Sequence, residues 1–283
     1  HRRAEEVGDD TYPSCFAVSD LASASIGVVG DAMAALLEVL GLASTPPQVT
    51  VDRRLASLWF AQSIHPVDWE MPPVWDAIAG DYETKDGWIR LHANLPAHRA
   101  AALSVLKVPA ERETVAAAVK TMESDTLETA IVEAGGVAAK MRSQEEWSAH
   151  PQGAAVETEP LIHWSDPKQI TPPEWRPTLA RPFQGLRVLD LTRVLAGPVA
   201  TRTLAGFGAE VLRIDPPSWD EANVVPDITL GKRCAFLDLR QETDRKRFED
   251  LLGTAHLFVH GLRPGALNGL GLGQDRRRAL APN

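Results

Sequence analysis

The sequence predicts a mixed α/β fold whose main part is a doubly wound parallel sheet, accompanied by a smaller α+β domain. Three observations support this prediction. In the last hundred or so residues, short apolar runs of strand length alternate with amphipathic stretches of helix length. Such alternation is typical of parallel sheets with right-handed crossovers. Between residues 71 and 165 the pattern changes to three helical stretches with short strands, and prolines separate this segment from the final domain.

Residues 1–70 are expected to form a helical part of the large domain. Small and apolar side chains recur at helical spacing over 23–42, which predicts a tightly packed helix. A short strand is expected at 48–51 and a second buried helix at 54–62. Prolines and tryptophans crowd residues 64–81, so we place a domain boundary in that stretch.

Residues 71–165 predict the small α+β domain. A strand is expected at 87–92, and a short apolar strand follows the two glycines that end the last helix. The expected helices of this domain are residues 97–106, 112–122 and 124–134. Five prolines between residues 166 and 182 predict a semi-stiff linker.

Residues 183–283 show the α/β alternation most clearly, and we expect this domain to continue beyond residue 283. The expected strands are residues 185–191, 209–214, 234–239 and 255–259, and the expected helices are residues 197–207 and 242–252. Ligands of such sheets bind beyond the carboxyl ends of the strands. The residues that follow each strand are therefore the candidates for a site.

Composition excludes several classes of function. The chain has 283 residues, 44% of them hydrophobic, and its 29 basic and 38 acidic side chains leave a net charge of −9. An acidic chain without a dense basic cluster is a poor nucleic-acid binder. The longest apolar stretch, 32–43, is shorter than the roughly 20 residues of a membrane helix, so we expect a soluble protein that does not bind membranes.

Two distant cysteines, Cys15 and Cys234, predict no metal site and favour a cytoplasmic location. The first residue is His1, and we expect the true start to be missing.

Small residues and cations follow or precede the expected strands. Residues 192–198 open a helix, where free N–H groups favour an anion, but they lack the G-x-G-x-x-G pattern of dinucleotide sites. Asp215 is followed by prolines rather than by such glycines, so a nicotinamide cofactor is disfavoured. The segments 231–233 and 261–265 supply cations and flexible backbone that could hold a phosphorylated ligand. Solvated loop charges are the alternative interpretation.

Read together, the motifs resemble family III CoA-transferases, the CaiB/BaiF family, which includes formyl-CoA transferases and alpha-methylacyl-CoA racemases. The resemblance is carried by residues 185–198, 204–217, 231–239 and 263–272, with weaker similarity over 86–91 and 133–139. In the family, an aspartate at the start of a helix rich in small residues is the nucleophile. Residues 19–30 of this chain have a similar sequence. The resemblance therefore implies that Asp20 is catalytic. An N-cap that satisfies helix N–H groups is the simpler alternative for this residue.

The order of the motifs differs from that of the family, because the aspartate helix precedes the βαβ motifs. A fusion of a partial, degenerate copy with a complete one, or a true permutation, would produce this order, and we favour a truncated fusion. In the fused arrangement the large domain is a Rossmann-like domain assembled from both ends of the chain, and the working aspartate could lie beyond residue 283.

The family's CoA contacts map onto loop positions of this chain. The implied CoA-binding residues are Val194, Leu195, Ala196, Lys232, Arg233, Leu237, Arg240, Gly261, Leu262 and Arg263. Pro216 stands where relatives often carry Arg or Lys, and Gly261-Leu262 where they often carry Asn-Phe. The resemblance therefore leaves weakened or altered CoA binding open.

The leading functional hypothesis is an acyl-CoA:carboxylate CoA-transferase that works through an aspartyl-acyl anhydride and an aspartyl-CoA thioester. It would use acyl-CoA and a carboxylic acid as substrates, need no other cofactor, and form the interlocked homodimer of the family. The alternatives are a catalytically impaired CoA-binding or scaffolding homologue and a plain nucleotide-binding module. An acyl-CoA racemase or isomerase is disfavoured, because no histidine of the chain matches the racemase motif.

Overall fold

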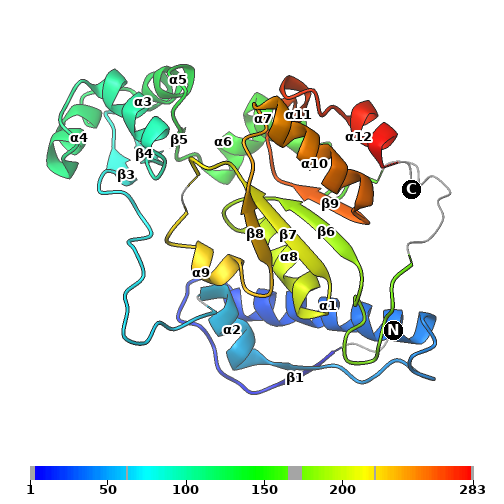
Figure 1. The fold of residues 1–283 in the computed structure, drawn as a ribbon. Coiled ribbons are helices and arrows are strands. Elements are labelled where there is room, and N and C mark those ends of the chain that lie inside the picture. Colours follow the sequence, from blue (N-terminus) through cyan, green and yellow to red (C-terminus); the bar gives the residue numbers. More distant parts are fainter. Residues whose placement is uncertain (1–3, 62, 165–173, 220, 282–283) are drawn as a thin grey trace. The chain divides into compact units, whose positions relative to one another are not determined.

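The computed structural model describes residues 4–61, 63–164, 174–219 and 221–281. The chain divides into two compact units (Figure 1). The first unit combines residues 1–71 with 169–283, and the second comprises residues 72–168. Most of the first half of the linker predicted at 166–182 lies outside the described residues.

A four-stranded parallel sheet organises the carboxyl-terminal part of the first unit. Its strands are β6 (Arg187–Leu191), β7 (Glu210–Asp215), β8 (Arg233–Phe236) and β9 (Leu257–His260). Their order in the sheet is β8-β7-β6-β9, and each neighbouring pair is parallel. The predicted mixed α/β fold with a parallel sheet is therefore confirmed.

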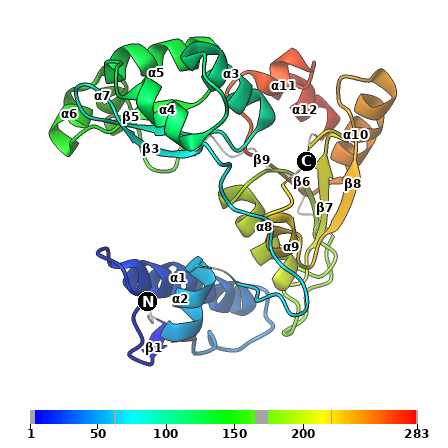
Figure 2. The ribbon, with the colours of Figure 1, turned by 90° about the vertical axis from the view of Figure 1, so that its left-hand side faces the viewer.

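Helices cover both faces of this sheet (Figure 2). They are α8 (Ala196–Gly206), α9 (Val225–Ile228), α10 (Glu242–Thr254), α11 (Ala266–Gly269) and α12 (Gln274–Leu280). Successive side chains of β6 point to opposite faces. Leu189 belongs to a core with Phe248 of α10, whereas Val188 belongs to a second core that Leu204 of α8 packs against. Asp190 lies on the α8 side, because it has the same orientation as Val188.

The amino-terminal part of the first unit is a small layer of helices and strands. Its elements are β1 (Glu5–Val7), α1 (Val18–Val39), β2 (Thr50–Asp52) and α2 (Arg53–Ala61). β1 and β2 pair in parallel, and Ala22 of α1 is fully buried in a core with Val51 and Ala56. Gly30 permits close packing, since a Cβ there would lie 2.5 Å from a methyl group of Val49. The predicted tightly packed helix is present, but it begins earlier, at Val18.

Helix α1 is longer than the apolar run that the sequence argument about membranes considered. Its 22 residues contain an 18-residue window with a mean hydropathy of 1.5, so by length and composition it could cross a bilayer. The sequence argument counted only an uninterrupted apolar run, whereas Val, Ala and Leu outweigh the few charges across the whole helix. About 28% of that window is buried within the protein.

The second unit is an antiparallel sheet with helices packed against it. Its strands, in sheet order, are β3 (Gly80–Glu83), β4 (Trp88–Leu91) and β5 (Ala138–Lys140). Its helices are α3 (Pro96–Leu106), α4 (Arg112–Val119), α5 (Ser124–Glu133), α6 (Gln144–Ala149) and α7 (Pro151–Glu157). Buried residues from β4, α4 and α5, such as Ile89, Val115 and Ile131, form one core. Strand β3 was not predicted, because it begins inside the proline-rich stretch taken as a domain crossing.

His256 provides a pH-sensitive contact between β6 and the residue that precedes β9. The Arg187 backbone N–H donates to His256 Nδ1 at 3.0 Å, and burial together with the Arg187 cation lowers the pKa of His256. A lowered pKa means that the folded state binds fewer protons than the unfolded state as pH falls from about 6.5. We therefore expect the free energy of unfolding to decrease as pH falls through that region. Urea titrations between pH 7.5 and 5 should show a smaller decrease for His256→Gln, and an unchanged dependence would contradict this assignment.

Candidate functional site

The order of the strands places a topological switch point at the carboxyl edge of the parallel sheet. Strand β6 lies between β7 and β9, so the chain continues to one side of β6 before it returns to the other side. At such a switch point the loops that follow the two strands diverge and leave a crevice for a ligand. In this protein those loops are residues 192–195, after β6, and 261–265, after β9.

Side-chain hydrogen bonds hold the loop after β6. The buried Asp190 carboxylate accepts from the Thr192 N–H at 2.9 Å, and from the hydroxyls of Thr192 and Thr201 at 2.5 and 2.6 Å. Gly197 lies against Thr192, because a Cβ at Gly197 would be 2.5 Å from Thr192 Cβ. The loop presents Val194 and Leu195 to solvent, with 53% and 58% of their surfaces exposed.

Lys232 lies in the interior rather than at the carboxyl edge. Its ammonium donates to Asp190 at 2.9 Å, to the Pro198 carbonyl at 2.9 Å and to the Thr201 hydroxyl at 2.7 Å. The side chains of Lys232 and Asp190 are both fully buried. Burial lowers the pKa of Lys232, against the opposing effect of Asp190. The three N–H donors of Lys232 are therefore all used inside the fold, so the structure does not support the sequence-based assignment of Lys232 to CoA.

Arg233 is also separated from the carboxyl-edge loops. It is the first residue of β8 and pairs with Leu212, so it lies toward the amino-terminal edge of the sheet. There it lines a cavity of about 320 Å³ together with Arg181 and Arg187. Sequence reasoning treated the residues before and after a strand alike, whereas a parallel sheet places them at opposite edges.

Two further predicted CoA-binding residues, Leu237 and Arg240, come after β8 in the chain. Leu237 is 8% exposed and belongs to the core on the α10 side, and Arg240 is exposed just beyond it. Both therefore lie toward the carboxyl end, but β7 separates β8 from β6.

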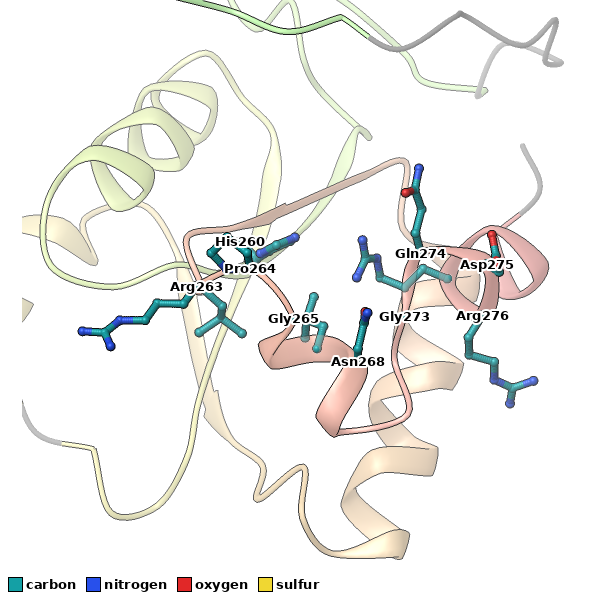
Figure 3. Close-up of a pocket in the computed structure, with 12 residues that line it drawn as sticks. His260, Arg263, Pro264, Gly265, Asn268, Gly273, Gln274, Asp275 and Arg276 are labelled. Atoms are coloured by element: carbon teal, nitrogen blue, oxygen red, sulfur yellow. The ribbon is translucent and has the colours of Figure 1, made fainter. Parts of the chain in front are cut away.

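A pocket of about 540 Å³ follows β9 (Figure 3). The predicted residues Leu262 and Arg263 line it, and Gly261 directly precedes them. The guanidinium groups of Arg263 and Arg276 extend to opposite sides of the pocket, so they do not converge on one point (Figure 3). Arg276 pairs with Glu249 at 2.6 Å, while no described residue forms an ion pair with Arg263.

Sequence reasoning missed the contribution of α12 to this pocket. Gln274, Asp275, Arg276 and Arg277 line it, and Arg277 also lowers the pKa of His260, in addition to the larger effect of burial. The three consecutive arginines at 276–278 were a signal that could have been used.

A second buried charge cluster lies beside the loop after β6 and was also missed. Arg213 contacts Asp215 at 2.7 Å and Glu221 at 2.6 Å, and its side chain is 1% exposed. Arg193 stacks over the Trp219 ring at 4.0 Å, and burial lowers its pKa. The signal in the sequence was Arg213 itself, a cation at a position of β7 that should be buried.

Asp20 occupies a separate pocket in the amino-terminal layer. It is the third residue of α1, and its carboxylate accepts from Arg53 Nη2 at 2.6 Å. The N-cap residue is Ala17, so the alternative of an Asp20 N-cap is not what the structure shows. Asp20, Ser23, Asp31 and Arg53 are among the residues that line a pocket of about 430 Å³.

The two pockets share no lining residue among those described. The Asp20 pocket is lined by residues between 4 and 53, and the pocket after β9 by residues between 260 and 277. The structure therefore does not bring Asp20 together with the residues assigned to CoA. Within the described ranges, no group of three His, Cys, Asp or Glu side chains is arranged to hold a metal ion.

Parts of this chain are similar in sequence to known proteins. Residues 183–283 match the family described as CoA-transferase family III. An acyl-CoA transferase of Gibberella moniliformis is 27% identical over 305 aligned positions, which cover 94% of this chain and 52% of that protein. An acetyl-coenzyme A transferase of Hypoxylon pulicicidum is 38% identical over 118 positions, covering 39% of this chain and 20% of that protein.

A solved structure of a CAIB/BAIF family protein from Brucella suis is also similar. It is 27% identical, with a TM-score of 0.34, over 36% of this chain and 31% of that one. The chain thus spans about half the length of the Gibberella relative and less of the other two.

Proposed function

Because residues 183–283 match the family III CoA-transferases, we propose that this protein is an acyl-CoA:carboxylate CoA-transferase. The observation that carries the proposal is the topological switch point between β6 and β9, where ligands of parallel sheets bind between the diverging loops. Five of the implied CoA contacts belong to these two loops: Val194, Leu195, Gly261, Leu262 and Arg263.

CoA is an anionic ligand, and cations toward the carboxyl edge of the sheet are suitable partners for it. We assign its phosphates to Arg263, with Arg240 as a further cation toward the same edge. No described residue forms an ion pair with either guanidinium, so neither has to give up a buried partner to bind phosphate. Backbone N–H groups at the start of α8 add donors for an anion. Lys232 and Arg233 are not part of this proposed set. Lys232 is buried against Asp190, and Arg233 lies toward the amino-terminal edge of the sheet.

In the proposed reaction an aspartate carboxylate attacks the thioester carbonyl of acyl-CoA. The C–S bond breaks, leaving an acyl-aspartyl anhydride and CoA thiolate. The thiolate attacks the aspartyl carbonyl, which releases the first acid and leaves an aspartyl-CoA thioester. A second carboxylate attacks that thioester to form a new anhydride, and the thiolate returns to the acyl carbonyl, which yields the new acyl-CoA and regenerates the aspartate. In this chain Asp20 is the candidate for that role, in the first turn of α1 where the helix dipole favours an anion.

Ligand-dependent unfolding tests the CoA assignment. A ligand that binds only the folded state at a hundred times its Kd adds about 2.7 kcal/mol to the free energy of unfolding. We expect CoA to raise the Tm in this way and NAD to leave it unchanged. Arg263→Ala should weaken CoA binding by about tenfold, as expected for loss of one charge-assisted contact. Arg278→Ala, an exposed arginine on α12, is the matched control. Equal stabilisation by NAD, or no effect of Arg263→Ala, would contradict the proposal.

One observation favours a second candidate function, a CoA-binding homologue that does not transfer acyl groups. Asp20 forms an ion pair with Arg53, and the pocket that it lines has no described residue in common with the pocket after β9. In the fused arrangement, a second aspartate elsewhere in a longer chain would carry the reaction. The continuous alignment to the longer Gibberella protein supports that arrangement.

We also propose a homodimer, which sedimentation of the purified protein would test.

A further inference from the structure

The loop after β6 contains a valine in a left-handed backbone conformation. Val194 has a φ of 66°, whereas β-branched residues strongly disfavour positive φ. Such a conformation persists only where neighbouring groups hold it, and it recurs at ligand-binding loops. Burial of the side chain does not explain it here, because Val194 is 53% exposed.

A buried carboxylate holds this conformation from outside the loop. The Val194 N–H donates to Glu221 Oε1 at 2.8 Å, across 27 positions of sequence. Glu221 is 7% exposed, and its other oxygen accepts from Arg213 Nη2 at 2.6 Å. Arg213 is held in turn by Asp215 at the end of β7. A chain of contacts thus connects β7 to the backbone of the loop after β6.

We propose that Glu221 is a positioning residue for the ligand: it keeps Val194 left-handed and thereby maintains the shape of residues 192–196 that receives CoA. This inference rests on the proposed function. Asp190 anchors the beginning of the loop through Thr192, and Glu221 anchors its middle. Without Glu221 the valine relaxes to negative φ, and only a fraction of molecules keeps the binding-competent loop. The apparent Kd rises by the inverse of that fraction.

A double-mutant cycle with calorimetric measurement of CoA binding tests the inference. Glu221→Ala should raise the Kd for CoA by about tenfold in the unaltered loop. Val194→Gly, which itself removes a side chain from the proposed binding loop, is the reference for the second arm of the cycle. Glycine adopts positive φ without strain, so in the Val194→Gly background Glu221→Ala should raise the Kd by less than about threefold. Glu221→Gln retains an acceptor for the Val194 N–H and should keep the Kd close to that of the unaltered protein.

A residue that only stabilises the fold would lower the Tm without changing the Kd of the folded protein. An unchanged Kd for Glu221→Ala, or an equal rise of the Kd in the Val194→Gly background, would therefore overturn the inference. If Glu221→Ala does not fold, Glu221→Met provides a side chain of similar size without an acceptor.

Failure of the proposed function can be told apart, because the unaltered protein would then not bind CoA. In that case hydrogen exchange at the Val194 amide carries the test. Exchange should be slow in the unaltered protein and at least tenfold faster in the Glu221 variant that folds, and equal rates would overturn the inference.

Discussion

Replacing Lys232 with methionine is expected to lower the free energy of unfolding by about 3–5 kcal/mol. The reason is that the fully buried Asp190 carboxylate would lose its cationic partner. Its hydrogen bonds from Thr192 and Thr201 would remain, but they do not neutralise its charge. Equilibrium unfolding in urea, analysed with a common m-value, measures the effect.

Two further variants separate burial from charge in this experiment. Lys246→Met breaks an ion pair on α10 whose side chains are 78% and 72% exposed, so it should cost less than about 1 kcal/mol. Lys232→Met combined with Asp190→Asn leaves no unpaired charge and should cost less than Lys232→Met alone. If Lys232→Met is no more destabilising than Lys246→Met, the buried ion pair does not have the role assigned to it.

Replacing Asp20 with alanine is expected to reduce CoA exchange between acyl donors and acids by at least about a thousandfold. Removing a nucleophile eliminates the covalent route, and only the much slower background reaction remains. CoA binding should change little, because Asp20 lines a different pocket from Arg263. The measurement is exchange of labelled CoA into a panel of acyl-CoA thioesters.

Asp31→Ala is the matched control, since Asp31 lies on the same helix and lines the same pocket. It should retain most of the exchange activity. Unaltered exchange in Asp20→Ala would exclude Asp20 as the nucleophile and favour an aspartate elsewhere. An unaltered protein that binds CoA but catalyses no exchange would favour the CoA-binding homologue.

Local periodicity was sufficient to predict most elements of the fold. The strands of the parallel sheet are short apolar runs, and the structure finds β6 at Arg187–Leu191 inside the predicted 185–191. Strand β3 escaped prediction, because a four-residue strand with a single large buried side chain, Tyr82, carries little periodic signal. Helix α12 escaped because its apolar residues are few and it has no buried residue.

The candidate site was less predictable than the fold. The sequence located the loops after β6 and β9 correctly, because the chain order of strands and helices determines where a loop begins. It could not show that Lys232 points into the interior or that Arg233 lies toward the other edge of the sheet. A cation beside a glycine in a loop has the same local sequence whether it meets solvent or a buried carboxylate 42 residues away.

The sequence by itself determined the α/β class, the parallel sheet with its crossovers, and the family resemblance of residues 183–283. These features depend on residue patterns within about twenty positions of each other. Only the tertiary structure decided which charges are free to meet a ligand. The pairing of Lys232 with Asp190, of Glu221 with the Val194 N–H and of Arg53 with Asp20 joins residues that are distant in sequence. The physical reason is that burial and charge neutralisation depend on which elements pack together. That packing cannot be read from residue patterns within one element.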